Sequence, residues 1–298
     1  MPLLINLEIA GVNFAILYRD SIILQDSDPA YKSFLKTERD TAAIDINIDL
    51  NLNNIPDTER LKKIFDSGQS WSMFRDNDNY CLALHPPVFQ EPLWLARINR
   101  EFTKVTVYCS EKLISASDGR VMVSNPVSYP LDQLLLMYVL TQNQGAIFHA
   151  AGIGINNKGY IFAGRSGAGK STLSRQFAAK KYPVLLSDDR VVIRKIDKAF
   201  MTFGTPWPGE EGIAINKSVP LSGIFFISHG SDNKIKEIDK KEALERLLPV
   251  TSIPWYDQEI MTKILNFCED VISNIPAYKL HFKPDFEVVD VLEKFASA

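Results

Sequence analysis

Residues 164–171 read Gly164-Arg165-Ser166-Gly167-Ala168-Gly169-Lys170-Ser171 and fit the pattern G-x-x-x-x-G-K-[ST] of a phosphate-binding loop. The apolar run 159–163 precedes this stretch, and a helix-forming run begins at Thr172. A strand leading in and a helix leading out are the context that the motif requires. Glycines let successive backbone N–H groups turn toward an anion at the helix N-terminus. We therefore predict that residues 164–172 bind the phosphates of a nucleotide.

The last two residues of this loop carry the groups that such a site needs for ATP and Mg²⁺. Lys170 is expected to reach the β- and γ-phosphates, and the Ser171 hydroxyl is expected to ligate Mg²⁺. The alternative is a glycine-rich turn with an exposed lysine, and the flanking strand and helix argue against it.

Acidic residues follow the next two apolar segments. The strand predicted at 183–187 ends in Asp188 and Asp189, where such folds place groups that face Mg²⁺ and the γ-phosphate. A loop rich in Gly and Pro at 204–212 then carries Glu210 and Glu211. Loops on a rigid sheet commonly carry function, but solvated acidic turns would show the same pattern.

The overall composition is that of an ordinary globular protein. The chain has 298 residues, 46% of them hydrophobic, and a formal net charge of -3, so nothing directs it toward nucleic acid or an anionic membrane. Its three cysteines have no metal-binding or C-x-x-C spacing. The N-terminus lacks the pattern of a secretion signal, and the longest apolar run, Leu134–Leu140, is too short to span a bilayer. We expect a cytoplasmic protein that binds neither nucleic acid nor membrane.

The hydrophobic periodicity and the positions of the prolines predict a two-domain α+β protein with a boundary at the prolines near residue 126. Residues 1–125 are expected to form a mostly antiparallel β domain that recognises a substrate or serves as an accessory domain. Its strands are predicted at 44–52, 71–75, 80–84, 93–98 and 103–109. Only Asp57–Phe65 is predicted as a helix there, capped by Asp57 or Thr58.

Residues 126–298 are expected to form an α/β catalytic domain around the phosphate-binding loop. Its predicted helices are 131–140, 172–181, 240–248, 257–274 and 286–295. Its predicted strands are 146–155, 159–163, 183–187, 191–196, 221–228 and 277–282.

Three short segments of this half, in order and closely spaced, resemble the catalytic domain of HPr kinase/phosphorylase. They are Phe148-His149-Ala150-Ala151-Gly152-Ile153, the loop 164–171, and Leu186-Ser187-Asp188-Asp189. The family shares a P-loop superfamily with the ATP-dependent phosphoenolpyruvate carboxykinases. The resemblance covers about residues 145–215 and implies a C-terminal domain of that fold.

The resemblance also implies residue roles. It implies that one of Asp188 and Asp189 is the general base for an acceptor hydroxyl, as the first such aspartate is in the family, and that the other lies near the metal. His149 matches a family histidine close to the active site, and Glu210 or Glu211 falls where the family has an acidic residue near the metal or that histidine. The implied activity is ATP-dependent transfer of a phosphoryl group to a serine-type hydroxyl of a protein, a peptide or free serine.

The sequence departs from the family at two places. Thr172 stands where a glutamate is usual, and the family's Pro-Gly-Arg loop is missing from the C-terminal third. That loop serves HPr binding and phosphorolysis, so neither carries over to this chain. A non-catalytic nucleotide sensor and a small-molecule ATPase stay open as alternatives. Relatives in the HPr kinase/phosphorylase family form hexamers, so a homo-oligomer stays open, although the contacts between their subunits are not traceable in this sequence.

Overall fold

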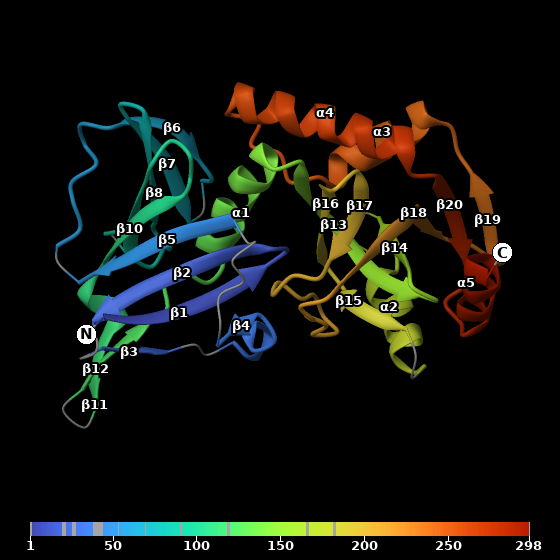
Figure 1. Ribbon diagram of the computed structural model, residues 1–298, viewed down its shortest axis with the longest axis horizontal. Coiled ribbons are helices and arrows are strands. Elements are labelled where there is room, and N and C mark those ends of the chain that lie inside the picture. The colour runs from blue at the N-terminus through green and yellow to red at the C-terminus, as the bar shows by residue number, and fades with distance from the viewer. Residues whose placement is uncertain are drawn as a thin grey trace. The chain divides into compact units, whose positions relative to one another are not determined.

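The computed structural model describes residues 2–297 apart from 20–21, 26–27, 38–43, 53, 69, 90, 118–119, 165–166 and 181–182. The chain divides into two compact units, Met1–Val139 and Leu140–Ala298. The division falls inside helix α1 (Leu131–Gln142), whereas the boundary expected from the sequence precedes that helix. Each unit is built on its own sheets, so the protein is a mixed α+β protein with a β-rich N-terminal part (Figure 1).

The N-terminal unit contains a nine-stranded sheet in the order β4-β1-β2-β5-β10-β9-β8-β7-β6. Most neighbours are antiparallel, and β5 is parallel to both β2 and β10. A second sheet has the order β11-β12-β3. The strands are β1 (Pro2–Ile9), β2 (Val12–Arg19), β3 (Ile22–Gln25), β4 (Leu35–Lys36), β5 (Ile44–Asn51), β6 (Lys62–Asp66), β7 (Trp71–Asp76), β8 (Asn79–Leu84), β9 (Trp94–Ile98), β10 (Lys104–Cys109), β11 (Ile114–Ser117) and β12 (Arg120–Ser124).

The helix predicted at Asp57–Phe65 is wrong. The Asp57 carboxylate accepts a hydrogen bond from the backbone N–H of Glu59 at 2.8 Å, so it closes a local turn. The chain then enters strand β6, which pairs antiparallel with β7. Aspartate favours both helix caps and such turns, and the pairing of the following segment with β7 decides between them here.

Helix α1 packs into the N-terminal unit through aromatic and buried polar contacts. The rings of Phe102 and Tyr138 stack with centroids 4.0 Å apart. The buried Asp132 carboxylate accepts a hydrogen bond from the Tyr31 hydroxyl at 2.7 Å. A buried carboxylate with a close donor avoids the cost of an unsatisfied charge.

Two long strands organise the C-terminal unit. β13 (Gly145–Ile155) pairs with β16 (Arg190–Ile196) through its first half and with β14 (Lys158–Ala163) through its second half. β18 (Ser218–His229) likewise pairs first with β17 (Ala199–Phe203) and then with β14 and β20 (Ala277–Phe282). β15 (Val184–Ser187) pairs with β13, and β19 (Lys234–Glu237) pairs with β20. The strand that enters the phosphate-binding loop, β14, therefore lies between β13 and β18.

Helices cover both faces of this mixed sheet (Figure 1). On one face, α2 (Lys170–Ala178) and α5 (Glu287–Ser297) enclose a buried apolar cluster with alternate residues of β13, β14, β18 and β20. On the other, α4 (Gln258–Asn274) follows α3 (Lys240–Leu247) and a short 3-10 helix, Leu248–Val250. Asp239 and Asp257 cap α3 and α4 by accepting backbone N–H groups of the first turn.

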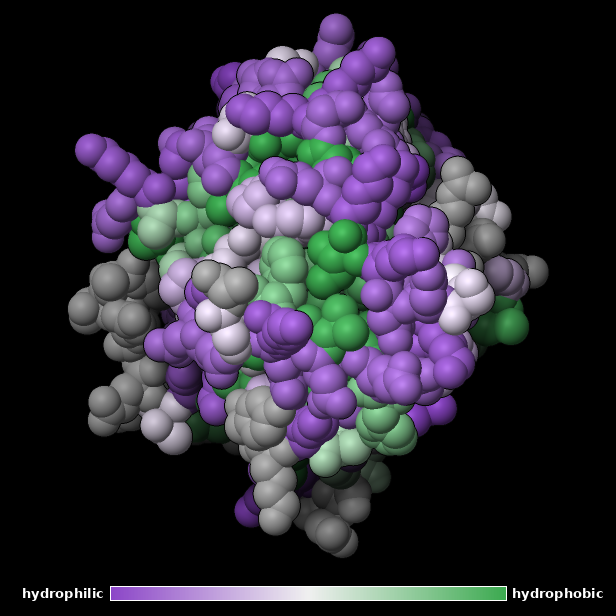
Figure 2. Space-filling view, turned by 90° about the vertical axis from the view of Figure 1, so that its right-hand side faces the viewer, coloured by the Kyte–Doolittle hydropathy of each residue, from purple (hydrophilic) through white to green (hydrophobic). Residues whose placement is uncertain are grey.

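None of the helices that the structure describes combines the length and the apolar sequence that crossing a membrane would need. Hydrophilic residues cover most of the face shown in Figure 2, and a smaller hydrophobic patch lies near its centre.

Candidate functional site

The phosphate-binding loop connects β14 to α2 as predicted. Gly167 and Gly169 have φ angles of +79° and +103°, a region that residues with a side chain adopt only under strain. Gly169 is the N-cap of α2 and offers no side-chain oxygen to the first-turn N–H groups. These donors are therefore available to an anion in the loop. Arg165 and Ser166, predicted to bind phosphate, lie outside the described residues.

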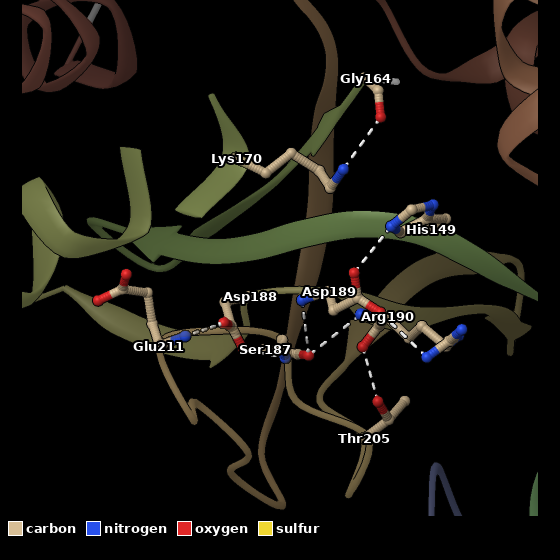
Figure 3. A network of polar contacts seen from close by, with 10 residues as sticks. His149, Gly164, Lys170, Ser187, Asp188, Asp189, Arg190, Thr205 and Glu211 are labelled. Atoms are coloured by element: carbon tan, nitrogen blue, oxygen red, sulfur yellow. Dashed lines mark hydrogen bonds and ion pairs between the residues drawn. The ribbon is translucent and has the colours of Figure 1, made fainter. Parts of the chain in front are cut away.

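Lys170 lies inside the loop rather than on the surface. Lys170 is only 8% exposed, and its ammonium donates a hydrogen bond to the carbonyl oxygen of Gly164 at 3.0 Å (Figure 3). Burial lowers the pKa of Lys170, and the nearby Asp189 charge opposes that shift. A cation held in this position has little access to water, which strengthens its attraction for an incoming anion.

His229 contacts the phosphate-binding loop, a role that the sequence did not predict for it. It ends β18, and its Nε2 atom donates a hydrogen bond to the Gly167 carbonyl oxygen, 2.8 Å away. Its ring stacks on Phe282 of β20, with centroids 5.9 Å apart. A Cβ atom on Gly169 would lie only 2.5 Å from the Phe282 ring, so the loop rests directly on this pair. No local motif signals His229, because strand pairing brings it beside the loop.

The two adjacent aspartates have different surroundings. Asp188 is 1% exposed. Its carboxylate accepts hydrogen bonds from the backbone N–H groups of Gly209 at 2.9 Å, Glu211 at 2.7 Å and Ile213 at 3.2 Å. Three charge-assisted hydrogen bonds of this kind fix the 209–213 loop against the end of β15.

Asp189 faces the neighbouring strand and the loop lysine. Its Oδ1 atom lies 2.7 Å from Nε2 of His149 on β13, and its Oδ2 atom lies 3.0 Å from Nη1 of Arg190 (Figure 3). Burial raises the pKa of the Asp189 carboxyl, but the hydrogen bond from His149 and the charges of His149, Arg190 and Lys170 outweigh burial, so the pKa is below its ordinary value. Asp189 is therefore ionised at neutral pH.

The two glutamates of the 204–212 loop also have different surroundings. The Glu211 carboxylate forms an ion pair with the Arg175 guanidinium on α2, and its hydrogen bond with Arg175 lowers the pKa of Glu211. Figure 3 shows the Glu211 carboxylate turned away from Asp188 and Asp189. Glu210, in contrast, lines the same cavity as the phosphate-binding loop.

That cavity has a volume of about 350 Å³ and gathers most of the predicted site residues. It is lined by loop and helix residues, by both members of the His149–Asp189 pair and by the 209–210 segment. The lining residues are His149, Gly167, Gly169, Lys170, Ser171, Thr172, Asp189, Gly209, Glu210 and His229. Asp188 and Glu211 are not among these residues.

The chemistry of this cavity fits a magnesium nucleotide. Within the described residues, no three His, Cys, Asp or Glu side chains cluster closely enough to hold a metal ion. Mg²⁺ is commonly bound through one or two protein oxygens, substrate phosphates and water. The Ser171 hydroxyl and the Glu210 carboxylate offer such oxygens beside uncapped N–H groups that suit phosphate.

A family model described as "SynChlorMet cassette protein ScmC" matches residues 127–294, more than half of the chain. The chain belongs to the ScmC family. The matched region of this ScmC-family chain contains the phosphate-binding loop and the two aspartates.

No curated protein matches the sequence. Among solved structures, the chain is distantly similar to the HPr(Ser) kinase/phosphatase from Coxiella burnetii, with a TM-score of 0.28 and 11% identity. The match covers 51% of this chain and 88% of that one.

Proposed function

We propose that this chain is an ATP-dependent kinase that transfers the γ-phosphoryl group to a serine-type hydroxyl of a protein, a peptide or free serine. The observation that carries the proposal is that the uncapped N-terminus of α2, the Lys170 ammonium and the Asp189 carboxylate line one cavity. An anion site and an ionised carboxylate side by side are what phosphoryl transfer to a hydroxyl requires.

Lys170 and the first-turn N–H groups of α2 would bind the β- and γ-phosphates and offset the charge that spreads over the γ-phosphoryl oxygens in the transition state. Ser171 and Glu210 would hold Mg²⁺, which supplies further positive charge to the phosphate oxygens. These groups position the phosphates before reaction, so little reorganisation is needed during transfer.

Asp189 would receive the proton of the acceptor hydroxyl. Each of its oxygens has two lone pairs, so a hydroxyl can donate to the carboxylate while His149 and Arg190 stay bound. Its lowered pKa is compatible with this role, because the hydroxyl loses its proton late in a loose transition state. His149 would keep the carboxylate oriented, and Asp188 would hold the 209–213 loop. Of the two aspartates, the geometry thus favours Asp189 as the base.

The sequence resemblance to HPr kinase/phosphorylase adds the acceptor class, a serine-type hydroxyl. The missing Pro-Gly-Arg loop argues against HPr and against phosphorolysis. A peptide or free serine is therefore the acceptor to test first.

The test is phosphoryl transfer by the full chain. The protein is incubated with γ-labelled ATP and Mg²⁺ and with free serine, serine-containing peptides or HPr, and phosphoserine is detected by mass spectrometry. We expect label in serine or a peptide with the natural chain and none with Lys170→Ala. ATP binding without transfer to any acceptor would contradict the kinase assignment, and a Lys170→Ala variant with unchanged ATP affinity would contradict the phosphate-binding loop.

A further inference from the structure

A second cavity, of about 450 Å³, adjoins the phosphate-binding loop. The loop itself forms one wall through Gly164 and Gly167. The end of β18 forms a second wall, and α3 with the following 3-10 helix forms a third, through residues 245–250. Its volume lies within the range of about 300–1,000 Å³ that small-molecule sites usually have.

The two cavities meet at the loop. Gly167 and His229 line both of them. The first cavity contains His149 and Asp189, which β13 and the end of β15 supply, whereas the second lies beside β18. Because β14 runs between β13 and β18, the loop at its end separates the two cavities. A ligand whose phosphates lie in the loop would thus extend toward Asp189 at one end and into the second cavity at the other.

The residues that line the second cavity suit a flat, mostly apolar group. Phe226 and Ile227 line it from β18, and Pro249 and Val250 face them from the 3-10 helix. Glu245 and Arg246 add polar groups, and both are exposed to solvent. Apolar walls with a few polar groups are typical of sites that bind a heteroaromatic ring and orient it by hydrogen bonds.

We propose that this second cavity receives the nucleoside of ATP, its base and ribose. The proposal rests on the proposed kinase function, because it needs the phosphates in the loop. The acceptor is a poorer occupant, since its hydroxyl must reach Asp189 on the other side of the loop. The sequence gives no indication of this site, because the walls opposite the loop come from segments more than fifty residues after it.

The proposal is tested by comparing ATP with inorganic tripolyphosphate, which has the phosphates and lacks the nucleoside. Isothermal titration of the natural chain should show ATP binding at least about tenfold more tightly than tripolyphosphate. Val250→Trp fills the cavity and should abolish this preference, with tripolyphosphate affinity unchanged within about twofold. Lys241→Trp is the matched control, because Lys241 is exposed on α3, just before the 3-10 helix that holds Val250, and does not line the cavity.

A second measurement covers the case in which Val250→Trp fails to fold. Photolysis of 8-azido-ATP bound to the natural chain should attach the base to residues 226–229 or 245–250, as mapped by mass spectrometry. Crosslinks elsewhere, equal affinity for the two ligands, or a Val250→Trp variant that keeps the ATP preference would overturn the proposal. Failure of the natural chain to bind tripolyphosphate would instead contradict the phosphate-binding loop, and the nucleoside site with it.

Discussion

The two units of this chain are both built on large sheets, yet they differ in how their strands end. In the N-terminal unit, β7 and β8 are joined by the two-residue turn Asn77-Asp78 and pair antiparallel, so their backbone donors bond within the sheet. In the C-terminal unit, β14 runs into a glycine loop and then into α2, whose first N–H groups lack a side-chain cap. The contrast teaches that an anion site forms where a strand–loop–helix junction leaves backbone donors without partners.

Buried polar groups show the same difference. In the N-terminal unit they bond to one another, as when Asn13 donates to Asn6 at 3.4 Å. In the C-terminal unit a buried lysine and an ionised aspartate instead face a shared cavity. Partnered polar groups stabilise a fold, whereas charges gathered around a cavity are available to a ligand.

The largest expected effect that would sharpen this contrast comes from the two adjacent aspartates. Asp189→Asn should slow phosphoryl transfer by about 10²–10⁴-fold, because the base is lost. Asp188→Asn should instead destabilise the protein by about 2–4 kcal/mol. The amide NH₂ of asparagine cannot accept a hydrogen bond, so one of the backbone N–H groups that now donate to the carboxylate would lose its acceptor. Turnover and urea unfolding of both variants measure the two effects. Equal losses of stability in the two variants would remove the distinction.

The three cysteines offer a test of whether the units respond separately to nucleotide. Cys81 and Cys109 lie in the N-terminal unit and Cys268 lies in α4, and all three are buried. Burial raises the pKa of Cys109 to about 12 and that of Cys268 to about 11, so alkylation requires unfolding of the unit that holds each cysteine, a state that cannot bind ATP. ATP at 100 times its dissociation constant should slow iodoacetamide labelling of Cys268 by about 100-fold and leave Cys81 and Cys109 unchanged.

The Lys170→Ala variant serves as the control for this labelling, since ATP should then protect no cysteine. If ATP slowed the labelling of all three cysteines equally in the natural chain, the two units would open as one body and the comparison between them would fail.

A smaller effect is expected at the base of the loop. His229→Ala removes the donor to the Gly167 carbonyl and should weaken ATP binding by about three- to tenfold. His229→Gln places an amide N–H near the position of Nε2 and should restore most of the affinity. His281→Ala is the control, because that ring contacts Ser228 on the same sheet and does not touch the loop. Identical losses for the alanine and glutamine variants would argue against the hydrogen bond.

The smallest expected effect is a shift in the pH dependence of ATP binding. Burial lowers the pKa of Lys170 and the Asp189 charge raises it. Binding needs the ammonium, so affinity should fall as pH rises through a pKa below that of an exposed lysine. Asp189→Asn removes the opposing charge and should move this loss to lower pH, whereas Glu211→Gln should not. Titrations without Mg²⁺ from neutral to alkaline pH measure the shift, and a move to higher pH would reverse the assigned cause.

Much of the C-terminal fold could be predicted because its signals are local. Apolar runs, caps and the glycine loop indicated β13, β14, α2 and α4 close to their observed bounds. The strand β6 was predicted as a helix, because its pairing with β7 is not visible in the local pattern. Strands β17 and β19 were missed for the same reason, since short segments gain their stability from neighbours rather than from propensity.

The sequence by itself determined the glycine loop between β14 and α2, since glycine at 167 and 169 permits the positive φ angles found there and Lys170 begins the helix. Only the tertiary structure decided which aspartate faces the cavity, which glutamate turns to Arg175, and that His229 supports the loop. Adjacent residues such as Asp188 and Asp189 are alike in sequence, and their surroundings differ because remote strands and loops pack around them.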